Sequence, residues 1–108
     1  MTSTSTVKLS SPLTTHSGPV TTITLKEPKA RSFFEHGEPF KAKVQTDDAG
    51  KDSIEFEYSH KVLAKFLSDM SGLDDMVLGN VVAGDYYALR NAATHLILGG
   101  AGTDFIAA

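Results

Sequence analysis

The residues of this chain that could carry chemistry are its four histidines, which lie far apart in the sequence. They are His16, His36, His60 and His95. A zinc site needs histidine or carboxylate ligands at short spacings such as His-Glu-x-x-His, and none of these histidines has such a neighbour. A pairing of His60 with Asp69, or of His95 with Asp104, would need the fold to bring distant segments together. We therefore interpret the histidines as solvated surface residues and expect no metal ion and no cofactor.

Three other patterns resemble catalytic or binding motifs without meeting their requirements. Ser-His-Asp combinations can be drawn from the many serines, but no Gly-x-Ser-x-Gly turn presents a serine nucleophile. The glycine-rich segment 99–102 follows an expected helix, whereas a phosphate-binding loop follows a strand and precedes a helix. The pairs Asp47-Asp48 and Asp74-Asp75 lack the alternating ligands and final glutamate of an EF-hand loop. With no cysteine nucleophile either, these observations predict that the chain is not an enzyme.

Composition narrows the class of protein further. The chain has 108 residues, of which 41% are hydrophobic and 21% charged, which is typical of one soluble globular domain. The net charge is −3 and the basic residues form no dense cluster, so a nucleic-acid partner is not expected. No apolar stretch has the length of a signal peptide or of a membrane span. We expect a cytoplasmic protein without nucleic-acid or membrane partners, which the absence of cysteine also suits.

Two short runs near the N-terminus predict a first β-hairpin. Val7 and Leu9 alternate with polar residues, and segment 20–25 is rich in β-branched residues and places Ile23 and Leu25 on one face. The connection between the runs is expected to be longer than a two-residue turn, which leaves the register open. Residues 1–5 have nothing to bury and are expected to be disordered.

A second hairpin is expected over residues 40–58. Its apolar residues alternate with charged ones on both sides of a polar, glycine-containing link. The apolar positions are Phe40, Ala42, Val44, Ile54, Phe56 and Tyr58. The lysines and glutamates between them would share the solvent face and pair across the strands. An alternative remains open, since Ile54, Tyr58 and Val62 are spaced by four and would also fit one long helix from about residue 53.

Helices are expected in the remaining segments. Pro28 suits the first position of a helix over residues 28–36, because its missing N–H needs no partner there, and Gly37 would end it. An amphipathic helix capped by Ser59 would end at Gly72. A short helical turn would begin at Asp74 or Asp75 and break at Gly79-Asn80, and a last helix would span residues 84–98. Its apolar face would hold Tyr86, Leu89, Ala93, Leu96 and Ile97.

Together these elements predict an α+β fold in which N-terminal β-hairpins pack against three or four short helices and the C-terminal part is helical. The single domain is expected to span residues 6–98, followed by a flexible tail over residues 99–108 that begins at Gly99-Gly100.

Two aromatic pairs, Phe33-Phe34 and Tyr86-Tyr87, carry the candidate binding site. Neighbours on a helix point about 100° apart, so both members of a pair cannot easily enter one core. Either the core stripe is wide, or one member of each pair is exposed as part of a partner-binding patch. The second interpretation predicts a surface made by Phe33, Phe34, Tyr86, Tyr87 and Arg90, with Tyr87 lying off the buried stripe.

The order of these segments resembles one family. The strand, charged residue, proline and helix start in residues 20–31 resemble tail assembly chaperones of long-tailed bacteriophages and prophages. The Ser-Gly-Leu helix end in residues 66–73 and the Asp-Tyr-x-x-Leu pattern in residues 85–89 are similar to later motifs of that family. The resemblance covers roughly residues 18–98. Residues 38–56 are an insertion relative to the compact members, so the second hairpin lies outside it.

The resemblance implies a function for the chain. Members of the family are non-enzymatic late proteins that bind the tape measure protein and the major tail tube protein in the host cytoplasm, and they are not expected in the mature virion. A long amphipathic partner chain needs its apolar surface covered until tube subunits enclose it. The alternative function is a structural component that stays in a phage tail or phage-like particle. Self-association into a homo-oligomer is open under either function.

Overall fold

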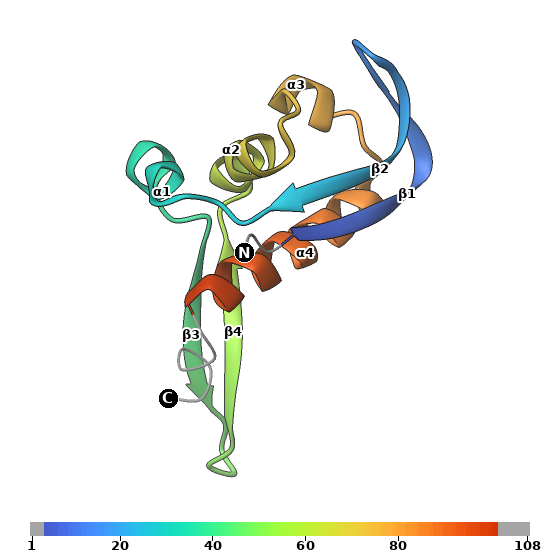
Figure 1. Ribbon diagram of the computed structural model, residues 1–108. Helices are drawn as coiled ribbons and strands as arrows, with labels where there is room; N and C mark the ends of the chain where they lie inside the picture. Colours follow the sequence, from blue (N-terminus) through green and yellow to red (C-terminus); the bar gives the residue numbers. More distant parts are fainter. Residues whose placement is uncertain (1–3, 102–108) are drawn as a thin grey trace.

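The computed structural model describes residues 4–101 and is an α+β fold of two β-hairpins and four helices (Figure 1), as the sequence predicts. The described elements, in chain order, are β1 (Thr4–Thr15), β2 (Gly18–Lys26), α1 (Ala30–His36), β3 (Phe40–Thr46), β4 (Asp52–Tyr58), α2 (His60–Ser71), α3 (Asp75–Leu78) and α4 (Ala83–Ala101). No helix in this part of the chain has both the length and the hydropathy to cross a membrane.

The first hairpin is longer and more tightly connected than expected. β1 and β2 are antiparallel, with Val7 opposite Ile23 and Thr15 opposite Gly18. Only His16 and Ser17 lie between the strands, so the expectation of a long loop was wrong. Gly18 has a φ of 107°, a left-handed value that lets the chain reverse this sharply. Pro12 therefore lies within β1 rather than in a loop, in the stretch where the register shifts.

The boundaries of the predicted domain need two corrections. Thr4 and Ser5, expected to be disordered, belong to β1 and pair with Lys26 and Leu25, because the strand alternation begins earlier than Val7. At the other end, α4 continues through Gly99 to Ala101, although residues 99–108 were expected to be a loose tail. Residues 1–3 and 102–108, which include Asp104, lie outside the described part of the chain.

The two longer glycine-terminated helices, α1 and α2, end where the glycine has a positive φ. Gly37 and Gly72, with φ of 90° and 78°, end α1 and α2 as expected, and each N–H bonds a carbonyl of the last turn. Gly99 has no such φ, and α4 passes through it without a stop. Glycine in a helix costs stability but does not by itself break the hydrogen-bond ladder.

The starts of the helices differ in detail from the expectation. α1 begins at Ala30, because Lys29 at its N-cap keeps an extended backbone, so Pro28 precedes the helix instead of opening it. Ser59 occupies the N-cap of α2, but its side chain makes no capping hydrogen bond. Asp74 caps α3 by accepting from the backbone N–H of Met76, and Gly79 follows as expected.

The core lies between the first hairpin and the long helices. α2 packs on β2 and α4 packs on β1, so two helices cover one face of this two-stranded sheet. The apolar side chains buried in this core come from β1, β2, α2, α3 and α4. They are Val7, Leu9, Leu13, Ile23, Leu25, Leu63, Phe66, Leu67, Met70, Leu78, Leu89, Ala93 and Leu96. The predicted apolar face of α2 is therefore core, and so are Leu89, Ala93 and Leu96 of the predicted α4 face, whereas Tyr86 and Ile97 are only partly buried against it.

The second hairpin is confirmed, which excludes a helix that starts near residue 53. β3 and β4 pair without a register shift, with Phe40 opposite Tyr58 and Val44 opposite Ile54. On the polar face, Lys43 Nζ lies 2.7 Å from Glu57 Oε2. Among the described elements β3 and β4 pack extensively only with each other, and the hairpin projects away from the helices (Figure 1).

Candidate partner-binding surface

The pair Phe33-Phe34 is divided between the core and the solvent. Phe33 packs edge-on against the buried ring of Phe66, with ring centroids 4.9 Å apart. Phe34, on the other side of α1, is 84% exposed. The structure thus places one member of the pair inside and the other outside, and Phe34 is the most exposed of the large apolar side chains in residues 4–101.

The pair Tyr86-Tyr87 is also divided, since Tyr86 packs against the core and Tyr87 is half-exposed. Tyr87 belongs to a stack of side chains. The guanidinium carbon of Arg90 lies 4.7 Å from the ring centre of Tyr87 and 4.6 Å from that of Tyr58. Arg90 is therefore held between two aromatic faces, a cation–π arrangement that fixes all three side chains. We call Tyr58, Arg90 and Tyr87 the aromatic stack. Tyr87 is its outer member and is 50% exposed.

Polar contacts hold the inner side of the aromatic stack. The Tyr58 hydroxyl lies 3.0 Å from the Thr94 hydroxyl, which donates to the Arg90 carbonyl oxygen at 2.8 Å. Beside the stack, the hydroxyl of Tyr86 lies 2.6 Å from Nδ1 of His60, and burial raises the pKa of this tyrosine. Because these bonds join α4 to the end of β4 and the start of α2, the stack sits on a rigid junction.

The five predicted site residues do not all meet. Tyr86, Tyr87 and Arg90 gather with Tyr58, a residue that the sequence assigned only to the second hairpin. Within residues 4–101, no ring–ring or cation–π contact joins Phe34 to them. The candidate surface is therefore the aromatic stack, with Phe34 as a separate exposed side chain on α1.

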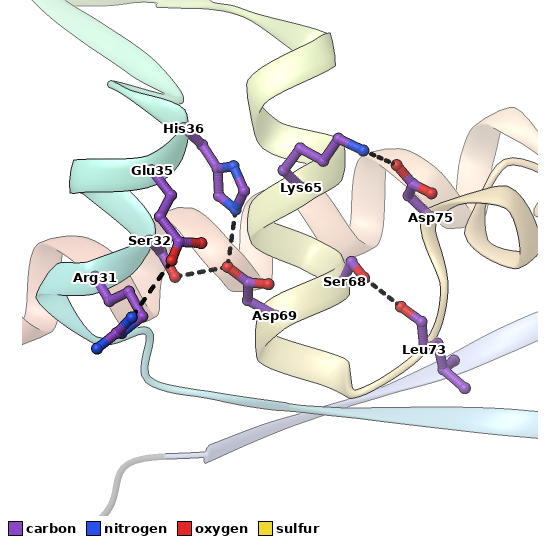
Figure 2. Close-up of polar contacts among 9 residues, drawn as sticks. All are labelled: Arg31, Ser32, Glu35, His36, Lys65, Ser68, Asp69, Leu73 and Asp75. Carbon is purple, nitrogen blue, oxygen red and sulfur yellow. Dashed lines mark hydrogen bonds and ion pairs between the residues drawn. The ribbon is translucent and has the colours of Figure 1, made fainter.

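A serine, a histidine and an aspartate do converge, between α1 and α2 (Figure 2). Ser32 Oγ donates to Oδ2 of Asp69 at 2.8 Å, and Nε2 of His36 lies 3.1 Å from the same oxygen. A catalytic triad needs the histidine between the serine and the carboxylate, so that it can accept the serine proton. Here the carboxylate is in the middle, and the contacts fasten α1 to α2. Asp69 thus meets His36 rather than His60.

Asp85, at the start of α4, is a buried carboxylate that the sequence analysis placed in the Asp-Tyr-x-x-Leu pattern without predicting its contact. It is 6% exposed, and its two oxygens accept from the backbone N–H of Ser10 at 3.0 and 3.1 Å. Ser10 lies where β1 shifts its register against β2. The carboxylate thus satisfies an N–H in the irregular stretch of the strand, and that N–H lowers the pKa of Asp85.

We expect this contact to make stability depend on acid. A carboxyl whose folded pKa is lowered stabilises the fold fully above its unfolded pKa, which is about 3.9, and loses this contribution as pH falls through the folded pKa. Asp85→Asn keeps a hydrogen-bond acceptor but removes the charge, so it should lower the unfolding temperature at pH 7 and flatten its decline below about pH 4. Thermal unfolding from pH 7 to pH 2 measures both effects. Asp48→Asn, in the exposed β3–β4 loop, is the control, and equal profiles for the two variants would contradict the assignment.

An apolar groove of about 700 Å³ opens at the base of the second hairpin. We call it the base groove. Its lining residues are Glu27, Pro28, Phe33, Glu38, Pro39, Phe40, Lys41, Ala42, Ile97 and Leu98. They come from four stretches of the chain: the β2–α1 link, α1, the α1–β3 link together with the start of β3, and the end of α4. Its size is that of a ligand pocket, but its few polar side chains come without a convergent catalytic group. The groove is suited to apolar side chains.

Within residues 4–101, no three histidine, aspartate or glutamate side chains are grouped so that they could hold a metal ion. Comparisons with known protein families, with curated protein sequences and with solved structures find no significant match for this chain.

Proposed function

We propose that this chain is a non-enzymatic tail assembly chaperone of a long-tailed phage or prophage, and that it captures the tape measure protein and assists assembly of the tail tube. The aromatic stack is the observation that carries the proposal. Tyrosine and arginine are, with tryptophan, the residue types enriched among the dominant contacts of protein interfaces. A half-exposed tyrosine already held by a cation loses little freedom on binding, so more of its contact energy remains as affinity.

The chemistry of the stack suits an amphipathic helical partner. The Tyr87 ring offers apolar area, and its hydroxyl can stay hydrogen-bonded at the rim of the contact. Asn91 lies beside the stack, where its Oδ1 accepts from Arg90 Nε at 3.4 Å. An apolar ring with polar groups beside it matches the border between the two faces of an amphipathic helix. The resemblance described above supplies the identity of the partner, and the major tail tube protein is the second proposed partner.

The test separates partner capture from folding. We expect Tyr87→Ala to unfold within a few degrees of the wild type, because half of its ring is already in solvent, and to capture clearly less tape measure protein on co-expression and pull-down. His95→Ala, exposed on the same helix, is the matched control and should capture normally. Pull-down with Phe34→Ala measures whether this separate exposed ring contributes to partner capture.

Two results would reject this assignment. If Tyr87→Ala folds normally and captures the partner at wild-type strength, the stack is not the binding surface. If the wild-type chain captures no tape measure protein but copurifies with finished tails, the alternative function, a structural component of the particle, would be correct.

A further inference from the structure

The guanidinium group of Arg90 uses few of its hydrogen-bond donors. An arginine side chain carries five N–H donors and normally meets carboxylate or carbonyl oxygens. Within residues 4–101, no carboxylate lies within ion-pair distance of Arg90. Its side-chain hydrogen bonds in this part of the chain go to Oδ1 of Asn91, from Nε at 3.4 Å and from Nη2 at 3.3 Å. Both distances exceed the usual N–H···O range of about 2.7–3.2 Å, so the charged group is weakly bonded.

The aromatic stack holds this guanidinium in place without using those donors. Its central carbon lies 4.6 Å from the ring centre of Tyr58 and 4.7 Å from that of Tyr87. A cation–π contact attracts the charge as a whole and leaves the N–H groups able to bond an acceptor. Tyr58 is fixed in turn, with its hydroxyl 3.0 Å from that of Thr94. A charge that is already held in position loses little side-chain freedom when a partner binds it.

Asn91 marks the position at which an incoming acceptor can bind. Its amide oxygen is shared between Nε and Nη2 of Arg90, two donors that together can bind both oxygens of a carboxylate in parallel bonds. We call this pair of donors the open edge of Arg90. Asn91 is exposed, so the edge that it contacts can be reached from solvent. A carboxylate there would replace two long bonds to a neutral amide with two shorter, charge-assisted ones.

The surroundings of the open edge suit an anion, although the chain as a whole has a net charge of −3. Over residues 86–101, α4 carries Arg90 and His95 and no acidic residue. The carboxylates that precede the tyrosines of the site are engaged elsewhere. Asp85 is buried against β1, and Glu57 pairs with a lysine on the polar face of the second hairpin. Neither of them competes for the open edge.

We propose that the open edge of Arg90 binds an aspartate or glutamate side chain of the protein partner, while apolar side chains next to that carboxylate pack on the Tyr87 ring. On a helical partner, this acidic residue lies at the border between the polar and apolar faces, three or four positions from an apolar residue. A nucleic-acid phosphate is disfavoured, because such partners need a cluster of cations. The inference rests on the proposed function, since it specifies the partner chemistry of the same site.

Substitutions of Asn91 test the open edge without altering the aromatic stack. Asn91→Asp puts a carboxylate of nearly the same shape at the edge, so it should compete with the partner and weaken capture of the tape measure protein by about tenfold or more. Asn91→Ala removes the competing acceptor and should capture at least as well as the wild type. His95→Asp adds the same charge one turn further along α4 and should also capture normally, which controls for general repulsion. All three sites of change are exposed, so thermal unfolding should stay within a few degrees of the wild type.

A double-mutant cycle then identifies the carboxylate on the partner. Arg90→Met fills the space between the rings but has neither charge nor donors, and it should weaken binding of a purified tape measure segment by about 10- to 100-fold in calorimetric titration. In that segment, each aspartate is replaced by asparagine and each glutamate by glutamine. One replacement should weaken binding to the wild type by about tenfold or more and have little further effect on Arg90→Met. A role of Arg90 limited to positioning Tyr87 would produce no such coupling.

The outcomes separate this inference from the proposed function. Capture that is lost in Tyr87→Ala but is equal for Asn91→Asp and Asn91→Ala would overturn the carboxylate site and leave the chaperone function standing. The absence of any partner carboxylate coupled to Arg90 would do the same. A wild-type chain that captures no tape measure protein would overturn both. Because the Asn91 variants leave the stack intact, they decide the question even if Arg90→Met unfolds.

Discussion

Replacing Phe66 by alanine is expected to reduce the free energy of unfolding by about 3–5 kcal/mol. The ring is completely buried in α2, where it packs against Phe33 from α1 and lies 6.2 Å from the ring of His36. Removing it leaves a cavity and separates α1 from the core at the same time. A domain of this size has a total stability of about 5–15 kcal/mol, so the variant should be close to unfolded at 37 °C.

Chemical denaturation with urea, followed by circular dichroism, measures this loss. Phe34→Ala is the matched control, because it removes the same ring from α1 at a position that is 84% exposed, and its change should stay within about 0.5 kcal/mol. Similar losses for the two variants would mean that α1 packs on α2 in another way than the structure shows.

Strong periodicity explains which parts of the fold could be predicted from the sequence. The alternation of Phe40, Ala42 and Val44 identifies a strand, and the stripe through Leu63, Phe66, Leu67 and Met70 in α2 identifies a core-facing helix. Both patterns repeat over several residues, so only one type of secondary structure puts all of the apolar side chains on one buried face. The competing spacing of four from Ile54 to Val62 failed because Tyr58 ends a strand before α2 begins.

Boundaries were less predictable, because they depend on single backbone angles. Gly72 and Gly99 each follow the expected end of a helix, but only Gly72 has a left-handed backbone. No side-chain pattern around them distinguishes the two positions. Pro12 suggested a loop, but a proline without an N–H is tolerated where β1 is irregular. The hydrogen bond from the Ser10 N–H to Asp85 joins residues 75 positions apart, so no local sequence pattern could have predicted it.

The candidate site could be predicted only in part, because helix geometry decides which side chains share a face but not how the helices pack. The 100° step of a helix left two interpretations of the aromatic pairs open, and the exposure of Phe34 and Tyr87 agrees with the second of them. It could not place Phe34 and Tyr87 relative to one another, because that depends on how α1 and α4 pack. It also missed Tyr58, which joins the aromatic stack from β4, and the base groove, which four separate segments assemble.

Replacing Leu96 by alanine is expected to cost about 2–5 kcal/mol, and the neighbouring residue provides the contrast. Leu96 is a buried core residue of α4, whereas the side chain of His95 in the same turn is exposed. Alanine favours helix at both positions, so any difference between the variants reports packing rather than helix propensity. Urea denaturation should show a large loss for Leu96→Ala and a change within about 0.5 kcal/mol for His95→Ala. Because Tyr87 lies on the same helix but outside the core, Leu96→Ala should lower partner capture only in proportion to the unfolded fraction. Capture lost by the folded fraction as well would mean that the end of α4 is part of the partner-binding surface.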